Sequence, residues 1–248
     1  MKPNYLNNGK THILYDADVL HHVDDEYFNP LWWKQRDALT GSAMGRGRTV
    51  FVRQGEGEYV LRHYRRGGMI ALFSDDRYLW AGLDKSRPWR EWHLLARLYG
   101  MGLPVPRPVA ARLQRRGLSY SADILMEKIP APSLCQRLLE GPLEPQRWQK
   151  IGACIRCFHD AGVYHADMNA HNILLTDGGG VYLIDFDRGE LREDPDGAWK
   201  QSNLDRLQRS LRKLINLRLD FHFEEQDWKE LLCGYADTST CDKQACKL

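Results

Sequence analysis

Residues 164–187 have the sequence YHADMNAHNILLTDGGGVYLIDFD, and this stretch carries the strongest structural signal in the chain. Two short apolar runs, Asn172–Leu175 and Val181–Ile184, flank a turn with three successive glycines at 178–180. Apolar runs of this length around a glycine turn are typical of a β-hairpin. We therefore expect two antiparallel strands whose outer ends lie next to each other.

Polar side chains occupy the outer ends of this expected hairpin. Asp167 and Asn172 stand before or at the start of the first run, and Asp185 follows the second run. Because a hairpin brings its ends together, these three oxygen-bearing side chains should converge on one point. Acidic residues at strand ends are also common turn formers, so residue type alone leaves a purely structural role open.

The order of these residues resembles the catalytic core of the protein-kinase-like superfamily: His-x-Asp, four residues, Asn, a hairpin and Asp-Phe. The resemblance implies that Asp167 accepts the proton of an acceptor hydroxyl and that Asn172 and Asp185 hold Mg²⁺. Hard oxygen ligands suit Mg²⁺, and a carboxylate suits the proton transfer. Asp187 stands where protein kinases have glycine, which argues against an activation-loop switch of their kind.

Glycines upstream of this core are candidates for nucleotide binding. Gly45 and Gly47 precede a strand-like run at 49–52. At this place, a glycine hairpin can lay backbone N–H groups over nucleotide phosphates. The spacing differs from the Gly-x-Gly-x-x-Gly of protein kinases, and many ordinary hairpins also carry glycine.

Arg62 and Glu91 form a second candidate pair for nucleotide binding. Arg62 lies in a strand-like run where protein kinases carry a phosphate-binding lysine, and Glu91 lies near the start of a helix predicted for 86–100. Arginine can hold phosphate through two parallel hydrogen bonds, and Glu91 could fix its guanidinium. The alternatives are an exposed strand arginine and an acid that favours a helix N-terminus.

The predicted fold is α+β, with the two lobes of a protein-kinase-like enzyme. Residues 1–127 would form a small N-lobe with an antiparallel sheet, and residues 128–248 a mainly helical C-lobe. Ser121–Met126 is predicted as a strand, and Glu127 then opens the hinge between the lobes. The hinge backbone, beginning at Glu127, would pair with adenine.

A closer resemblance is carried by several separated motifs and spans about residues 40–220. These motifs are similar to those of bacterial 3-deoxy-D-manno-octulosonic acid (Kdo) kinases, which belong with the lipopolysaccharide-core sugar kinases. Both departures from protein kinases, Arg62 and Asp187, match that family's form. The motifs are RHYRRGG at 62–68, WREW at 89–92, PVPRP at 104–108, HADMNAHN at 165–172 and DFDRG at 185–189.

This resemblance implies ATP-dependent, Mg²⁺-dependent phosphorylation of the 4-hydroxyl of a Kdo residue on a lipid A precursor. It also implies peripheral attachment to the cytoplasmic face of the bacterial inner membrane, with no obligate protein partner. Two other functions compete: a kinase for a core heptose or another small-molecule hydroxyl, and a non-catalytic kinase-like module. The presence of Asp167, Asn172 and Asp185 together argues against the non-catalytic module.

Composition restricts the class of protein further. Hydrophobic residues make up 43% of the 248-residue chain, which is enough for a sizeable core. The net charge of +2 does not indicate a nucleic-acid partner. Cys154 and Cys157 have Cys-x-x-Cys spacing without a second pair, and we expect them to be small buried residues with reduced thiols. The first residues contain no apolar run of the kind found in secretory signals.

Three further segments complete the prediction. Residues 1–29 are polar and mixed, and we expect a solvated segment there. Residues 236–248 should form a loose tail. Residues 203–219 should form an amphipathic helix whose polar side is either a solvated face or a surface that docks anions. That polar side carries Arg206, Arg209, Arg212 and Lys213.

Overall fold

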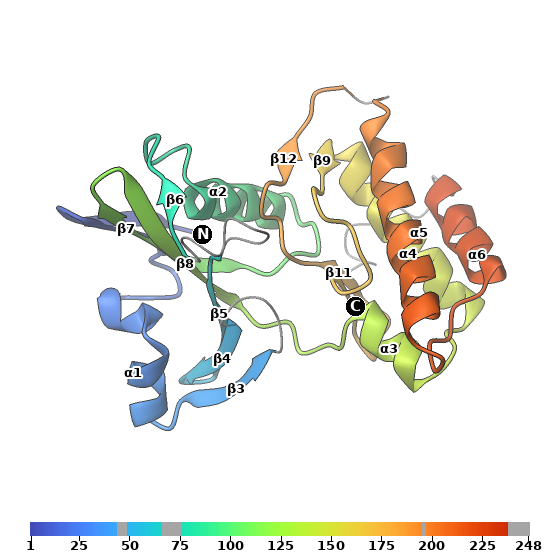
Figure 1. Cartoon of the computed structure of the whole chain (residues 1–248), viewed down its shortest axis with the longest axis horizontal. Helices are drawn as coiled ribbons and strands as arrows, with labels where there is room; N and C mark the ends of the chain where they lie inside the picture. The colour runs from blue at the N-terminus through green and yellow to red at the C-terminus, as the bar shows by residue number, and fades with distance from the viewer. Residues whose placement is uncertain (44–48, 66–75, 195–196, 238–248) are drawn as a thin grey trace. The chain divides into compact units, whose positions relative to one another are not determined.

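The computed structural model describes residues 1–43, 49–65, 76–194 and 197–237 (Figure 1). The chain divides into two compact units. Unit 1 comprises Met1–Ala96 and Pro106–Lys128, and unit 2 comprises Arg97–Val105 and Ile129–Leu248. The segment Arg97–Val105 falls within the range 1–127 that the sequence assigned to the N-lobe. It bonds instead to a strand of unit 2, since the Leu183 N–H donates to the Pro104 carbonyl (3.0 Å).

Unit 1 is built on an antiparallel sheet with the strand order β1-β2-β7-β8-β5-β4-β3, and β6 pairs with β8. The strand predicted at 121–126 lies within β8 and is confirmed. Of the strand-like run predicted at 59–68, residues 59–63 lie in β5, and residues 66–68 fall outside the described part of the chain. The strands are β1 (Pro3–Asn8), β2 (Thr11–Asp16), β3 (Leu39–Ala43), β4 (Thr49–Gln54), β5 (Gly57–His63), β6 (Tyr78–Leu79), β7 (Pro108–Arg116) and β8 (Ser119–Glu127).

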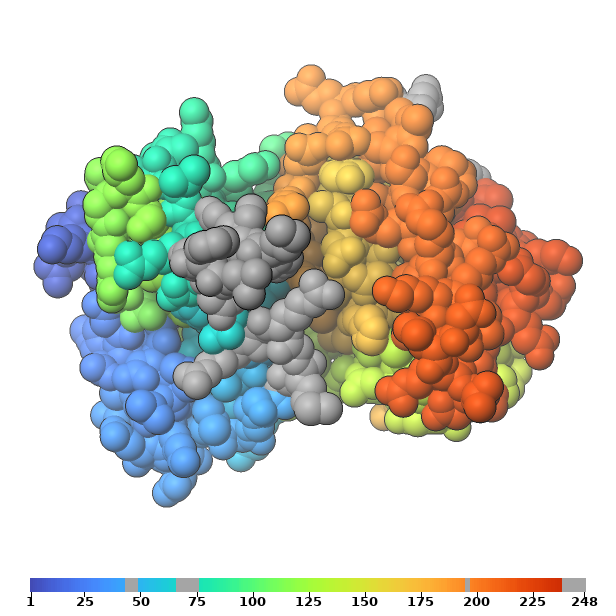
Figure 2. All heavy atoms as spheres, viewed as in Figure 1, coloured from blue at the N-terminus to red at the C-terminus, as the bar shows by residue number. Residues whose placement is uncertain are grey.

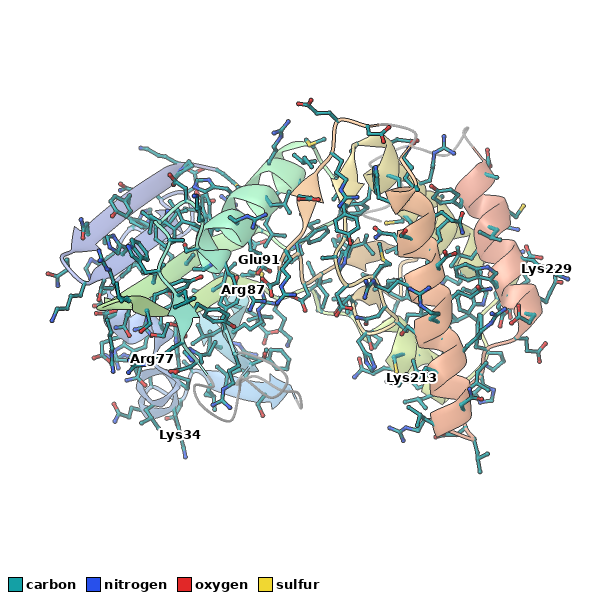
Figure 3. The ribbon with its side chains drawn as sticks, turned by 45° about the horizontal axis from the view of Figure 1, so that its top comes forward. Lys34, Arg77, Arg87, Glu91, Lys213 and Lys229 are labelled. Carbon is teal, nitrogen blue, oxygen red and sulfur yellow. The ribbon has the colours of Figure 1, made fainter. Side chains whose placement is uncertain are left out.

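The helix α2 (Arg87–Gly100) confirms the prediction for residues 86–100. Its apolar positions Trp92 and Leu95 are fully buried. The backbone N–H of Arg87, at the start of α2, donates to the Tyr120 hydroxyl of β8 (3.1 Å). Arg87 and Glu91 both project from this helix (Figure 3). Because α2 is anchored to the sheet in this way, the position of Glu91 relative to the sheet is fixed.

The prediction of a solvated segment over residues 1–29 is wrong. The strands β1 and β2 pair through a two-residue turn and extend the sheet. A 3₁₀ helix, η1 (Asp25–Phe28), and α1 (Pro30–Gln35) follow. Phe28 and Trp33 are buried in a core cluster with side chains of β2, β4, β5, β7 and β8. The segment after β2 therefore covers part of the sheet rather than standing in solvent.

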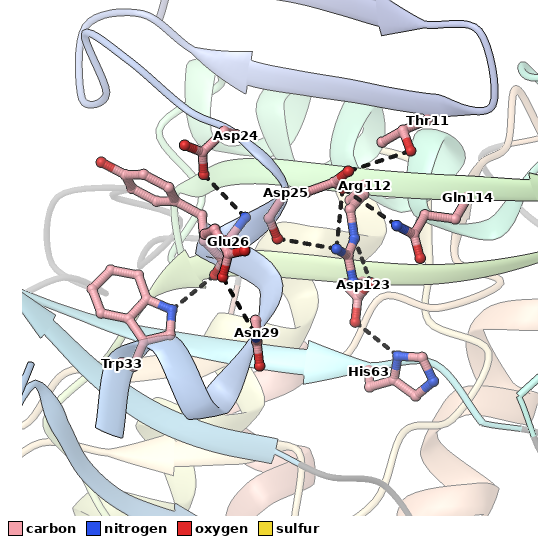
Figure 4. Close-up of polar contacts among 11 residues, drawn as sticks. Thr11, Asp24, Asp25, Glu26, Asn29, Trp33, His63, Arg112, Gln114 and Asp123 are labelled. Carbon is pink, nitrogen blue, oxygen red and sulfur yellow. Dashed lines mark hydrogen bonds and ion pairs between the residues drawn. The ribbon is translucent and has the colours of Figure 1, made fainter. Parts of the chain in front are cut away.

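A buried carboxylate organises the polar end of this sheet (Figure 4). Asp123 of β8 bonds His63 Nδ1 at 2.7 Å and accepts from Arg112 Nε and Nη2 at 3.0 and 2.8 Å. Arg112 Nη1 also donates to Asp25 of η1 at 3.1 Å. The hydrogen bond with Asp123 raises the pKa of His63 despite the opposing effect of burial. This network ties η1 to three strands of the sheet.

Unit 2 is mainly helical, which together with the antiparallel sheet of unit 1 confirms the α+β class. The helix predicted at 203–219 corresponds to α5, and short strand pairs lie between the helices of this unit. None of the helices in the described residues is both long and apolar enough to span a membrane. The elements are α3 (Leu134–Glu140), α4 (Pro145–Asp160), β9 (Val163–Tyr164), β10 (Ile173–Leu175), β11 (Val181–Leu183), β12 (Glu190–Leu191), α5 (Trp199–Leu217) and α6 (Glu225–Ala236).

Two glycines allow α4 and α6 to pack closely in unit 2 (Figure 1). A Cβ atom at Gly152 of α4 would overlap the backbone of Leu231, and one at Gly234 of α6 would overlap the backbone of Gln149. Cys154 and Cys157, on the same helix α4, are buried and are not joined in a disulfide, as predicted. The residues of the predicted tail that lie at 238–248 fall outside the described part of the chain.

Candidate functional site

The hairpin predicted from residues 172–184 is present, as β10 and β11. Ile173 pairs with Leu183 and Leu175 with Val181. Beyond the last of these pairs, the Ile184 N–H donates to the Asn172 carbonyl (3.0 Å). This bond places Asn172 beside the residue that precedes Asp185.

A second hydrogen bond connects Asn172 to the predicted base. Asn172 Nδ2 donates to the backbone carbonyl of Asp167 (2.9 Å). The structure therefore brings Asp167, Asn172 and Asp185 into one neighbourhood of unit 2, as the sequence pattern indicated. Because the amide nitrogen of Asn172 is engaged, its Oδ1 is the atom left to face a ligand.

His165 fixes the backbone around these residues. Its Nδ1 accepts from the Asp167 N–H (3.2 Å), so Nε2 must carry the proton and donate to the Ile184 carbonyl (2.9 Å). The ring is buried and lies 4.8 Å from that of Phe186. Burial lowers the pKa of His165, which favours this neutral, two-sided bridge.

The helix α5 supports the same loop from the other side. Asn203 accepts from the His165 N–H (3.1 Å) and donates to the His165 carbonyl (2.9 Å). Ser210 Oγ, two turns further along α5, accepts from the Ala170 N–H (3.3 Å). Between them, Arg206 Nη1 lies 4.0 Å from the Asp167 carboxylate. The sequence prediction did not include Asn203 or Ser210 as site residues.

Asp185 has an unusual backbone conformation. Its φ of 64° lies in the left-handed region, which residues other than glycine, asparagine and aspartate rarely adopt. Such conformations cluster at functional sites, where the surrounding structure holds them in place. Here the constraint comes from the hydrogen bonds that the preceding Ile184 makes with Asn172 and His165.

The donor set of this neighbourhood suits Mg²⁺ in a nucleotide complex. Among the described residues, no three His, Cys, Asp or Glu side chains group to hold a metal by themselves. Mg²⁺ commonly takes only one or two protein carboxylates and completes its shell with substrate phosphates and water. The Asp185 carboxylate and the Asn172 amide oxygen fit that pattern.

Unit 1 holds the predicted arginine–glutamate pair. Arg62 of β5 donates from Nη2 to both oxygens of Glu91 (2.6 and 2.5 Å). The Tyr64 hydroxyl donates to Glu91 Oε2 (2.5 Å). The Glu91 side chain is 1% exposed and that of Arg62 is 18% exposed. Burial raises the pKa of Tyr64 well above its usual value, so Tyr64 remains a donor to the carboxylate.

Glu127 is the one remaining nucleotide-binding candidate that the structure describes. Gly45 and Gly47 fall outside the described residues. Glu127, at the end of β8, pairs with Tyr59, three positions along β5 from Arg62. The Glu127 N–H donates to the Arg107 carbonyl (2.9 Å) and burial raises the pKa of its side chain. The role of the segment that begins at Glu127 in holding adenine stays a prediction.

Comparisons with known proteins identify the family of this chain. The model of the lipopolysaccharide kinase (Kdo/WaaP) family matches residues 31–235. The chain belongs to the lipopolysaccharide kinase (Kdo/WaaP) family. Its members are kinases, so this chain is a phosphotransferase that acts on a hydroxyl group. The resemblance to this family inferred from the motifs is therefore confirmed.

Curated relatives within the Kdo/WaaP family match most of the chain. A 3-deoxy-D-manno-octulosonic acid kinase of Vibrio parahaemolyticus is 42% identical over 220 residues, which cover 88% of this chain and 91% of the relative. A kinase of the same name from Xylella fastidiosa is 46% identical over 202 residues, 82% of this chain and 80% of the relative. One from Haemophilus influenzae is 41% identical over 234 residues, 90% and 95% of the two chains.

A solved structure supports the kinase-like fold of this Kdo/WaaP family member. WaaP, determined in complex with acyl carrier protein, matches with a TM-score of 0.52 and 21% sequence identity. The match covers 86% of this chain and 87% of WaaP. This likeness extends to the fold of nearly the whole chain and confirms the predicted kinase-like architecture.

Proposed function

We propose that this protein uses ATP and Mg²⁺ to phosphorylate the 4-hydroxyl of a Kdo residue on a lipid A precursor. One observation carries the proposal: Asp167, Asn172 and Asp185 lie together in a chain whose curated relatives are named Kdo kinases. Phosphoryl transfer needs a carboxylate at the nucleophile and oxygen ligands for the metal, and this neighbourhood offers both.

Asp167 is the proposed base. Its side chain is 61% exposed, so an acceptor hydroxyl can reach it from solvent. Its backbone is held by His165 through the N–H and by Asn172 through the carbonyl. The carboxylate is thus accessible on a backbone that is held in place, which suits proton transfer from a bound hydroxyl.

Asn172 and Asp185 are the proposed ligands of Mg²⁺. When bound with ATP, the ion would neutralise charge on the transferred phosphoryl group. Asn172 would offer Oδ1, since its amide nitrogen is already used by the Asp167 carbonyl. Asp185 would offer its carboxylate from the left-handed backbone position.

Arg62 and Glu91 of unit 1 are the proposed grip on the ATP phosphates, together with Gly45 and Gly47. Glu91 holds the Arg62 guanidinium through Nη2. For adenine, the segment that begins at Glu127 offers the N–H of Ile129, which makes no hydrogen bond within the described residues. In this assignment residues 1–127 supply the groups that hold the ATP phosphates, and residues 128–248 supply the N–H of Ile129, the base and the metal ligands.

Peripheral attachment to the inner membrane follows from the acceptor, which is a lipid. The C-terminal end of α5 has a composition that suits a membrane surface. Leu217, the last residue of α5, and Leu219, two residues beyond it, are exposed at 65% and 108%, on either side of Arg218. Lys213 projects from the same helix (Figure 3). Apolar and basic side chains combined in this way favour anionic lipid surfaces.

The test is a transfer assay with the full chain. Labelled ATP, Mg²⁺ and a Kdo-bearing lipid A precursor should give labelled lipid, whereas a heptose-bearing acceptor without free Kdo should not. Asp167→Asn should bind ATP as the unmodified protein does and lose transfer. Label on heptose alone would assign the protein to core heptose phosphorylation. ATP binding without transfer to either acceptor would identify a kinase-like module without activity.

A further inference from the structure

Arg206 occupies a position next to the proposed base that the proposed function leaves unused. Its Nη1 lies 4.0 Å from Asp167 Oδ1, and among the described residues no other cation lies that close to this carboxylate. The distance is too long for a hydrogen bond. The side chains are 45% and 61% exposed, so this contact contributes almost nothing to stability.

The position of Arg206 is nevertheless fixed by its helix. Asn203, one turn before it, bonds both backbone polar groups of His165, and Ser210, one turn after it, bonds the Ala170 N–H. These contacts hold α5 to the loop on either side of Asp167. The helix α5 forms part of the surface of unit 2 in the view of Figure 2. Arg206 is therefore a solvent-accessible cation beside the base, carried on a helix backbone that is anchored to the catalytic loop.

We propose that Arg206 binds the carboxylate of the acid sugar and thereby places its hydroxyl against Asp167. The inference rests on the proposed function and adds the residue that selects an acidic acceptor. The Arg206 guanidinium makes no hydrogen bond within the described residues, so its five N–H donors are available to a ligand. Guanidinium and carboxylate match as parallel pairs of donors and acceptors.

The chemistry of the acceptor agrees with this arrangement. In a 3-deoxy-2-ulosonic acid ring the carboxylate is attached to carbon 2 and the acceptor hydroxyl to carbon 4. Only the unsubstituted carbon 3 separates them, so the two groups lie a few ångströms apart on one small ring. Asp167 and Arg206 are separated by a similar span, 4.0 Å between their nearest atoms. One acceptor can therefore engage both residues.

The transferred phosphoryl group is the other anion that comes near Asp167. Its charge is assigned to Mg²⁺ held by Asn172 and Asp185, from the hairpin β10–β11. Arg206 approaches the base from a different element, α5. The phosphoryl group is therefore already matched with a cation, the Mg²⁺ ion. Arg206 remains as the cation for the carboxylate of the acceptor.

The experiment compares Arg206→Ala with Arg209→Ala in steady-state assays with the Kdo-bearing acceptor. Arg209 lies one turn further along α5, is exposed and has no ion-pair partner among the described residues. Arg206→Ala should raise KM for the acceptor by about tenfold or more, the typical loss for a charged hydrogen bond. Its kcat and its KM for ATP should stay within about threefold, and Arg206→Lys should recover part of the loss. Arg209→Ala should match the unmodified protein.

A second arm uses an acceptor whose carboxylate is converted to its methyl ester. For the unmodified protein, KM should be higher for the ester than for the acid, by the same factor by which Arg206→Ala raises KM for the acid. For Arg206→Ala itself, KM should be the same for the ester and the acid. Equal KM values for Arg206→Ala and Arg209→Ala would overturn the inference and leave the proposed function intact. So would a fall in kcat at unchanged KM, which would assign Arg206 to the phosphoryl group. Absence of transfer by the unmodified protein would overturn the proposed function itself.

Discussion

Asn203 bonds both backbone polar groups of His165, accepting from its N–H at 3.1 Å and donating to its carbonyl at 2.9 Å. Asn203 is 1% exposed and lies 38 residues away in sequence. Through His165, which bonds the Asp167 N–H and the Ile184 carbonyl, this one amide connects α5 to the base and to the strand before Asp185. The site is therefore held from a helix that contributes no proposed base or metal ligand.

Asn203→Ala should destabilise the protein, because it leaves two buried backbone groups without partners. Each unpaired group costs about 1–3 kcal/mol, so the loss for the two groups should be about 2–6 kcal/mol in the free energy of unfolding. Denaturant unfolding measures it. Ser202→Ala, at the exposed neighbouring position, should stay within about 0.5 kcal/mol of the unmodified protein. A similar small change for Asn203→Ala would mean that water replaces the lost bonds.

Arg62→Ala should raise KM for ATP and lower stability. It removes the proposed phosphate-binding side chain and takes one cationic partner away from the Glu91 carboxylate, which is 1% exposed. Removing one partner of a buried ion pair costs about 3 kcal/mol. Arg62→Lys keeps the charge and should recover most of the stability, while KM for ATP stays raised because the bidentate fork is lost. Nucleotide titration and denaturant unfolding measure the two effects separately.

The control for this pair is Arg53→Ala on the neighbouring strand β4. Arg53 is 58% exposed and bonds Glu58 at 2.8 Å, so its loss should change stability by at most about 1 kcal/mol. KM for ATP should not change. If Arg62→Ala behaved like Arg53→Ala, the arginine–glutamate pair would be only structural and the phosphates would be held elsewhere.

The sequence predicted those site residues that lie close to one another along the chain. Asp167, Asn172 and Asp185 lie within one 24-residue stretch, 164–187, that contains a hairpin with a glycine turn, and hairpin geometry alone brings them together. Asn203 was missed because its partner is distant in sequence. A signal existed, since an asparagine one turn before Leu207 lies on the apolar side of the helix and must find a hydrogen-bond partner when buried.

The N-terminal hairpin was missed for another reason. Its turn signal is present: Gly9 has φ 63° and stands at the first central position between Asn8 and Thr11. The strand β1 is exposed along its whole length, so no apolar alternation marks it. The apolar run Ile13–Tyr15 is only three residues long. The polar composition of residues 1–29 as a whole therefore favoured the prediction of a solvated segment. An exposed edge strand is held by backbone pairing, which leaves little trace in side-chain pattern.

Asp185→Asn should separate stability from activity. Asparagine tolerates the left-handed backbone (φ 64°) at least as well as aspartate, so thermal stability should be unchanged or slightly higher. Transfer should fall by about 100-fold or more, because a metal-binding carboxylate is worth several kcal/mol of charge stabilisation. Asp185→Ala should lose activity similarly and also lose about 1 kcal/mol of stability, since alanine is strained at this φ. Equal stability of the two variants would show that the backbone relaxes.

His159 should make unit 2 sensitive to acid. It is 1% exposed on α4, bonds Tyr235 through Nδ1 at 2.8 Å and lies 5.2 Å from the Trp199 ring. Burial lowers its pKa from 6.5 to about 4. As the pH falls, His159 therefore becomes protonated near pH 6.5 in the unfolded chain but only near pH 4 in the folded chain. Stability contributed by this group is complete above pH 6.5 and is lost as pH falls through that window.

The expected loss from His159 is about 2 kcal/mol between pH 7 and pH 5, at about 1.4 kcal/mol for each unit of proton affinity. His159→Phe keeps the ring and removes the titration, so its free energy of unfolding should fall less over this interval than that of the unmodified protein. His222→Phe, at an exposed position of the same unit, should leave the acid loss intact. Denaturant unfolding at the two pH values measures the difference. Parallel pH profiles for His159→Phe and the unmodified protein would assign the acid sensitivity to another group, with the buried His165 the next to substitute.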